Sequence, residues 1–530
     1  MKRLLACCLF TLLAAAQENP LLKTGGRQIK NVNPDDARLL GILARGLAYE
    51  AEKKGQTTET SKALFAAATA AFQKEDWNRA WRLTARLNTL LIGEAPGEEM
   101  EVAASVDIQL NKRIVSGDSL TLFVRPLYVP DPAPTKKYMV KLSLKDSSGN
   151  VHKTTTVPIE QIPESGHTLD AAQAPEGHFF IEFELLCEGK TLTSAVRDVY
   201  SVPTLRSRLD ALRPKLEKVK SVELKTAGMR AAAESAEYIT TLLTRLTREY
   251  VADMNKVTHP FAVKMGGSRL TGYTSDMFKL PQDLDFAESL IDALLVGKDI
   301  LATRSGDMRM AHRSSIDKTL QPFRVFVPEG FDPKKQYPLI VGLHGATGDE
   351  NTYMDRYNSA DGTSLFKRLA QERGYIVVTP NGRGPYGMYL DNSEKDVMEV
   401  LERVAALYPI RKDQVFLCGH SMGGGGTWHV GFSHPDRFRA LAPVASGFGG
   451  RVQGLPSVPL KNAAEMPVLF SYGLKDTLAT PENSKRIIAY SKTILKNFES
   501  REFPDDHFAI GVSSMQHIFD FFDRFREKAQ

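Results

Sequence analysis

The spacing of apolar and polar residues divides the 530-residue chain into stretches of different character. Between residues 34 and 91, apolar side chains recur every three or four positions, which predicts amphipathic helices. Between 103 and 201, short β-branched and aromatic runs alternate with turn-forming clusters, which predicts several short strands. The helical period returns between 205 and 301, and after about residue 306 strand-like and helical patterns alternate.

Alternating strands and helices are typical of a doubly wound, mostly parallel sheet. The run from Pro338 to Leu343 is continuous and apolar, as expected for a strand buried on both faces. The other strands that we predict in this part are 323–327, 375–379, 415–418, 440–444, 468–472 and 500–503. The fold class that we expect here is therefore α/β.

The first residues have the pattern of an export signal. Lys2 and Arg3 precede an apolar run from Leu4 to Leu13, and three alanines follow before Gln17. The run is too short to span a bilayer comfortably, and no later stretch is apolar for long enough. We predict a cleavable signal peptide and a secreted or periplasmic protein. A lipoprotein signal ending at Cys7 is the alternative, although it leaves almost no apolar core.

These patterns predict five regions. They are a signal peptide at 1–16, a helical region at 17–100, a β-sandwich at 101–203, a helical connecting region at 204–303 and an α/β domain at 304–530. The spacing of the short strands is typical of an antiparallel sandwich of the immunoglobulin-like kind.

Charge and cysteine content exclude several classes of protein. The net charge of +5 is spread along the chain, without a basic run that would favour nucleic-acid binding. Beyond the signal peptide, Cys187 and Cys418 make neither a disulfide framework nor a metal motif. Cys418 is expected to be a buried apolar residue. We predict no cofactor, no metal and no nucleic acid, and the patterns predict no particular oligomeric state.

A glycine-flanked serine follows the strand predicted at 415–418. The sequence Gly419-His420-Ser421-Met422-Gly423 is a G-x-S-x-G motif, in which a tight strand-to-helix turn exposes a serine hydroxyl. The alternative is a glycine-rich loop with a chance serine. The run Gly423 to Gly426 predicts a helix packed tightly on the sheet, and no G-K-[ST] follows that would indicate a phosphate site.

Two further groups stand after predicted strands, in the order Ser, Asp, His that elbow-type hydrolases use. Asp476 and His507 are the acid and base that a Ser421 nucleophile would need. Asp476 could instead cap a turn. The rival base His517 falls at helical spacing, which favours a packed position.

An oxyanion hole requires two backbone N–H groups, each stabilising the transition state by roughly 3 kcal/mol. Met422 supplies one by position, and Gly345 or Ala346 in the loop after Leu343 would supply the other. The alternative for this loop is a simple turn. His420 is expected to turn away, as a packing or hydrogen-bonding residue.

Four residues are candidates for lining the substrate site. They lie in or near the predicted loops and are His344, Tyr386, Tyr389 and Trp428. Each could instead serve packing.

The segment from about Pro322 to Phe522 resembles the α/β-hydrolase superfamily, particularly secreted esterases of the polyhydroxybutyrate-depolymerase and feruloyl-esterase type. The residues that carry the resemblance are Leu343-His344-Gly345, Pro380-Asn381-Gly382-Arg383-Gly384, 419–424, His434-Pro435-Asp436-Arg437-Phe438, Asp476 and His507. It implies a catalytic domain at 304–530 and a small-molecule or polymer-linked ester as substrate.

We therefore predict a secreted serine hydrolase that cleaves carboxylic esters through an acyl-enzyme intermediate. The alternative is a peptidase, because the domain also resembles that of prolyl-oligopeptidase-type enzymes. Those usually carry a β-propeller upstream, whereas this chain has helices and a sandwich pattern. A third reading is a non-catalytic binding scaffold.

Overall fold

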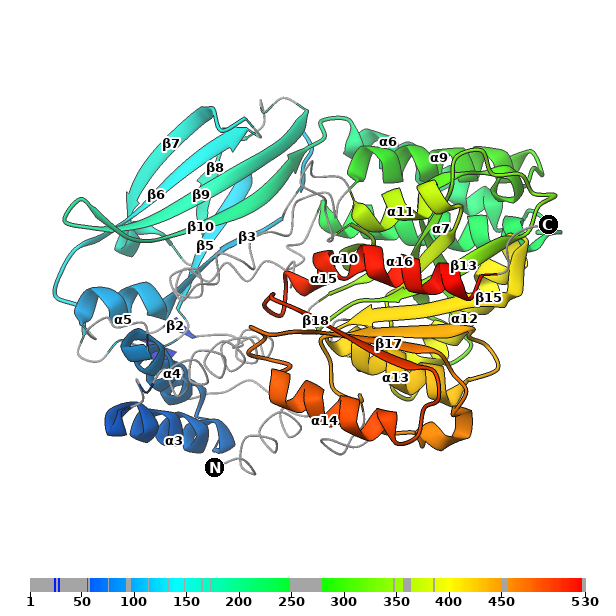
Figure 1. Cartoon of the computed structure of the whole chain (residues 1–530). Helices are drawn as coiled ribbons and strands as arrows, with labels where there is room; N and C mark the ends of the chain where they lie inside the picture. Colours follow the sequence, from blue (N-terminus) through cyan, green and yellow to red (C-terminus); the bar gives the residue numbers. More distant parts are fainter. Residues whose placement is uncertain are drawn as a thin grey trace. The chain divides into compact units, whose positions relative to one another are not determined.

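A computed structural model describes the chain from residue 58 onward, apart from 92–96, 131–132, 172–173, 248–278, 356–363, 385–386, 450–455, 527–530 and several single residues. Before residue 58 it describes Gly55 and the backbone of 23–24 and 27–28. The start of the helical pattern at 34–91 and the predicted signal peptide therefore lie outside the described residues. The chain separates into two compact units (Figure 1). One holds the described residues up to Arg206 together with 244–247, and the other holds 207–243 and 279–526.

The first unit contains helices and two sheets. Its helices are α3 (Glu59–Gln73), α4 (Trp77–Leu91) and α5 (Glu98–Ser105). The two-residue strands β1 (Lys23–Thr24) and β2 (Arg27–Gln28) pair with each other. A three-stranded sheet has the order β3-β5-β8, with β3 (Val106–Leu110), β5 (Leu120–Pro126) and β8 (His167–Leu169).

The second sheet of this unit has the order β4-β10-β9-β6-β7. Its strands are β4 (Ile114–Val115), β6 (Tyr138–Asp146), β7 (Val151–Pro158), β9 (Gly177–Cys187) and β10 (Lys190–Ser201). Side chains of both sheets share one hydrophobic core, including Leu120, Leu122, Leu142 and Phe183. The short β4 runs parallel to β10, so this sheet is mixed where the sequence predicted an antiparallel one.

The second unit is built on an eight-stranded sheet of order β11-β12-β14-β13-β15-β16-β17-β18. Its strands are β11 (Gly306–Arg313), β12 (Leu320–Val327), β13 (Tyr337–Leu343), β14 (Ile376–Pro380), β15 (Ile410–His420), β16 (Ala440–Val444), β17 (Val468–Gly473) and β18 (Phe498–Phe503). From β14 to β18 in this order all neighbours are parallel, whereas β11 and β12 are antiparallel. The mostly parallel sheet predicted from the sequence is confirmed.

Helices flank this sheet on both faces (Figure 1). α11 and α16 pack on one face through Phe366, Phe519 and Phe522, while α12, α13 and α14 lie on the other. The helices that lie wholly or mainly in this unit are α6 (Leu205–Val219), α7 (Ala227–Leu246), α9 (Leu280–Leu295), α10 (Glu350–Asp355), α11 (Leu365–Arg373), α12 (Asn392–Leu407), α13 (Met422–Ser433), α14 (Pro481–Lys492), α15 (Ile510–Ser513) and α16 (Met515–Arg524). Among the described residues, none of the helices is both long and apolar enough to cross a membrane.

Among the elements that differ from the prediction, β11 and α9 do so for clear physical reasons. The sequence did not predict β11, because Arg309 and His312 interrupt its apolar pattern although both side chains are buried. The helix predicted up to Leu301 ends at Leu295, since Gly297 adopts a φ of +70° there. A glycine in this left-handed region commonly terminates a helix.

Candidate active site

Ser421 stands at the turn between β15 and α13. Ser421 has a φ of 58° and a ψ of −116°, a backbone conformation that is strained for any residue that carries a Cβ. The Ser421 N–H donates to the Val444 carbonyl oxygen at 2.9 Å, which ties the turn to β16. This is the local geometry of the predicted elbow.

Glycines are required around this turn because the backbone comes too close for a side chain. A Cβ on Gly419 would lie 2.3 Å from the Gly423 carbonyl oxygen, and one on Gly423 would lie 2.0 Å from the Leu343 carbonyl oxygen. The rest of the run, Gly424 to Gly426, is similarly close to its neighbours, with Gly426 against the Tyr389 ring. The tight packing predicted for this helix is confirmed.

The structure brings Ser421, His507 and Asp476 together from three different strand ends. His507 Nε2 lies 2.8 Å from Ser421 Oγ, and His507 Nδ1 lies 2.7 Å from Asp476 Oδ2. Asp476 is 1% exposed and His507 is 6% exposed, so water has little access to the contact between them. A serine hydroxyl placed in this way can pass its proton to the imidazole as it attacks.

Asp476 also stabilises the turn in which it lies. Its Oδ1 accepts hydrogen bonds from the N–H groups of Leu478 and Ala479 at 2.8 and 2.7 Å. The two roles considered for this residue are therefore divided between its two oxygens, one in the turn and one on the imidazole.

Two other histidines, His517 and His420, were considered in the sequence analysis, and neither takes the place of His507 beside Ser421. His517 lies on α16, with its ring 5.6 Å from that of Phe503, and does not contact Ser421. His420 is buried, and its Nε2 lies 2.6 Å from the His507 carbonyl oxygen, to which it can donate. His420 thus fixes the backbone of the His507 loop, as a hydrogen-bonding residue.

The loop after β13 approaches the serine directly. A Cβ on Gly345 would lie 3.4 Å from Ser421 Cβ, so the Gly345 backbone is next to the Ser421 side chain. Ala346 follows in the turn, and Met422 is the first residue of α13, whose N–H has no acceptor within the helix. The Gly345 backbone and the start of α13 therefore both lie beside Ser421, where an oxyanion hole would need its donors.

Two of the residues proposed to line the substrate site instead support this loop. His344 is fully buried, with Nδ1 2.8 Å from the Gly345 carbonyl oxygen and Nε2 2.8 Å from that of Asn381. The Tyr389 hydroxyl, also buried, donates to the His344 carbonyl oxygen at 3.2 Å. For these two residues the structure favours the packing alternative.

The other two candidates for substrate contact are placed as follows. Trp428 is 1% exposed and packs among Phe432, Phe448 and Phe470, which again favours packing. Tyr386 lies outside the described residues.

Cys418 is fully buried in β15, as expected from its sequence. Burial raises the pKa of its thiol to about 12, although a contact with the Tyr353 hydroxyl opposes the shift. A thiol of this kind is protonated at neutral pH and is a poor nucleophile.

Within the described residues, two groups have the residue types and spacing of metal ligands, and each already has a basic side chain close to its carboxylates. Lys136 Nζ lies 2.7 Å from Glu99 and 3.7 Å from Glu188 in the group that includes Cys187. The other group is His312, Asp396 and Glu399, where Arg383 Nε lies 3.7 Å from Asp396. Neither group contains Ser421, Asp476 or His507.

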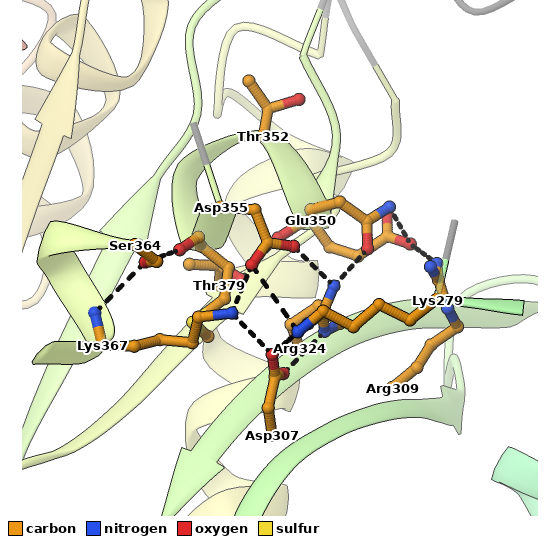
Figure 2. A network of polar contacts seen from close by, with 12 residues as sticks. Lys279, Asp307, Arg309, Arg324, Glu350, Thr352, Asp355, Ser364, Lys367 and Thr379 are labelled. Carbon is orange, nitrogen blue, oxygen red and sulfur yellow. Dashed lines mark hydrogen bonds and ion pairs between the residues drawn. The ribbon is translucent and has the colours of Figure 1, made fainter. Parts of the chain in front are cut away.

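A buried network of charged side chains lies beside α10 (Figure 2). Asp307 forms ion pairs with Arg324, Lys279 and Lys367. Arg324 and Lys367 also form ion pairs with Asp355. Burial by itself would raise the pKa of Asp307, but its three cationic partners hold it well below its usual range. This network could not be predicted from the sequence, because its members lie far apart along the chain.

Parts of the chain are similar to known peptidases and esterases. Residues 363–448, which include Ser421, match the family model Peptidase_S9, the prolyl oligopeptidase family. A probable feruloyl esterase C of Aspergillus terreus is 30% identical over 122 residues, 23% of this chain and 44% of that protein. Dipeptidyl-peptidase 5 of Porphyromonas gingivalis is 27% identical over 144 residues, 24% of this chain and 20% of that protein.

The chain therefore matches less than half the length of these curated relatives. Among solved structures, the fluorophosphonate-binding serine hydrolase FphF of Staphylococcus aureus is 21% identical, with a TM-score of 0.35 over 42% of this chain and 99% of that one. The second unit has the sheet order and the serine elbow of an α/β-hydrolase fold, and residues 363–448 within it are similar to the prolyl oligopeptidase family.

Proposed function

We propose that this protein is a secreted hydrolase of carboxylic esters, acting through an acyl-enzyme intermediate on Ser421. The observation that carries the proposal is the line of contacts from Ser421 Oγ through His507 to Asp476, at 2.8 and 2.7 Å. Similarity to a feruloyl esterase supports the choice of an ester. Secretion rests on the signal-peptide pattern of residues 1–16.

In this mechanism Ser421 Oγ attacks the ester carbonyl while His507 Nε2 takes its proton. Asp476 keeps Nδ1 protonated and stabilises the imidazolium that forms. The N–H groups of Met422 and of Gly345 or Ala346 receive the developing oxyanion. His507 returns the proton to the departing alcohol, and a water molecule then hydrolyses the acyl-enzyme with the same base.

A peptidase is the second candidate, because the match at 363–448 is to the prolyl oligopeptidase family. Both reactions pass through a tetrahedral intermediate, so the same three side chains serve either. The difference lies in the leaving group and in the surfaces that bind it.

The experiment compares kcat/KM for p-nitrophenyl acyl esters with that for aminoacyl and prolyl p-nitroanilides. We expect the esters to be the better substrates and Ser421→Ala to abolish their turnover. Ser433→Ala, at the other end of α13, is the matched control and should retain activity. Anilide turnover well above ester turnover would replace the proposal with the peptidase. If the wild type turns over neither class of substrate, the hypothesis of a non-catalytic binding scaffold is favoured instead.

A further inference from the structure

The oxyanion loop, residues 344–346, is connected to a buried carboxylate that has no part in the triad. Glu350 is the first residue of α10 and is 3% exposed. Its Oε2 accepts a hydrogen bond from Asn381 Nδ2 at 2.8 Å, and its Oε1 accepts one from Arg309 Nη1 at 2.9 Å. Glu350 and Arg309 belong to the group of side chains drawn in Figure 2.

Asn381 carries the connection onward to the loop. Its carbonyl oxygen lies 2.8 Å from His344 Nε2, while His344 Nδ1 lies 2.8 Å from the Gly345 carbonyl oxygen. A carbonyl oxygen only accepts, so a neutral ring donates to one of these two partners and a protonated ring to both. In either state the imidazole fills the space between the Asn381 backbone and the Gly345 backbone.

The backbone of Glu350 is tied to the same strand end. Thr379 Oγ1, in β14, donates to the Glu350 carbonyl oxygen at 2.6 Å. Two hydrogen bonds thus join the start of α10 to the end of β14, one through the Glu350 side chain and one through its backbone. α10 begins shortly after the oxyanion loop. Glu350 is therefore linked to both ends of the loop, to the first through Asn381 and His344 and to the second through the start of α10.

We propose that Glu350 is a positioning residue for the oxyanion loop, acting through Asn381 and His344. The proposal rests on the hydrolase function given above, and it adds a residue that touches neither substrate nor triad. Donors in an oxyanion hole act only if they point at the developing charge, so a displaced loop lowers transition-state stabilisation with little effect on substrate binding.

The charged and polar groups around Glu350 hold its carboxylate in one position. Burial and the neighbouring Asp349 raise the pKa of Glu350, whereas Arg309 and the Asn381 amide favour its ionised form. Arg309 is itself held by Asp283, whose Oδ2 accepts from Arg309 Nε at 2.7 Å. The carboxylate therefore has a donor on each oxygen, and neither oxygen can move without losing one.

Asn381→Ala is the most direct variant, because it removes the link and leaves the Glu350–Arg309 ion pair in place. With p-nitrophenyl acetate we expect kcat to fall about tenfold and KM to change less than twofold, since one donor misplaced costs less than the 10²–10³ of a donor removed. Glu350→Ala should give a similar loss, and the double variant no further loss. Glu350→Gln should recover much of kcat, because the Asn381 amide can turn over and accept from it.

Asp355→Ala is the matched control, as it also removes a buried carboxylate of the same network but does not contact Asn381. It should lower the free energy of unfolding while keeping kcat within twofold of the wild type. An unchanged kcat in Asn381→Ala, an equal loss in Asp355→Ala, or additive losses in the double variant would each overturn the positioning role. A wild-type protein without ester turnover would instead overturn the proposed function, and the positioning role with it.

Discussion

Replacing Asp476 by asparagine tests how the base is oriented. Asp476 Oδ1 accepts from two backbone N–H groups, those of Leu478 and Ala479, so the amide oxygen of an asparagine must take that side. Its NH₂ group then faces His507 Nδ1, which has to be unprotonated to accept from it. The ring carries its proton on Nε2 instead, 2.8 Å from Ser421 Oγ, and cannot take the serine proton.

A ring in this wrong tautomer lowers kcat by roughly 10⁴ in the trypsin-type triad, and we expect a similar loss here. That loss corresponds to about 5 kcal/mol of activation free energy, at about 1.4 kcal/mol per factor of ten. The asparagine keeps the shape of the aspartate and both turn hydrogen bonds, so the melting temperature should change little.

The assay is the steady-state turnover of p-nitrophenyl esters, followed with the thermal unfolding of each variant. Asp506→Asn is the matched control, because Asp506 also accepts from two loop N–H groups, those of Phe508 and Ala509. It should keep kcat within a few-fold of the wild type. A value of kcat for Asp476→Asn within tenfold of the wild type would refute the assigned orientation.

Two predictions concern stability, measured as the free energy of unfolding in urea. Gly423→Ala should cost about 1–3 kcal/mol or more, because its Cβ would lie 2.0 Å from the Leu343 carbonyl oxygen, whereas Gly447→Ala, with nothing within 4 Å, should be nearly neutral. Asp307→Asn should cost about 3 kcal/mol at neutral pH by leaving three cations without their shared carboxylate. Since the folded pKa of Asp307 is depressed, its contribution is complete above about pH 4 and is lost as the pH falls, so the variant should show a weaker acid dependence. Equal stabilities for the two glycine variants, or the same acid dependence for wild type and Asp307→Asn, would contradict these expectations.

Local motifs explain why much of the site could be predicted from the sequence. The elbow needs glycines at fixed offsets from Ser421, and parallel strands bring their carboxyl ends to one edge of the sheet. Asp476 and His507 each follow one of these strands, so their meeting with Ser421 follows from strand order alone.

Long-range packing could not be predicted in this way. Tyr389 occupies space that Gly382 and Gly426 leave beside its ring, and neither glycine indicates this partner by its local pattern. The contact between Glu350 and Asn381 joins the start of α10 to the residue after β14, and a buried glutamate at the start of a helix looks the same in sequence as an exposed one. The network in Figure 2 was missed for the same reason, since it pairs charges from several separate elements.

The central claim is that Ser421 is the nucleophile, and covalent labelling tests it most directly. The full chain is treated with a fluorophosphonate probe, and the adduct is located by mass spectrometry of its peptides. We expect one adduct per chain on Ser421, none in Ser421→Ala, and slow labelling in Asp476→Asn. An adduct that persists in Ser421→Ala, or that maps to another serine of the wild type, would contradict the account.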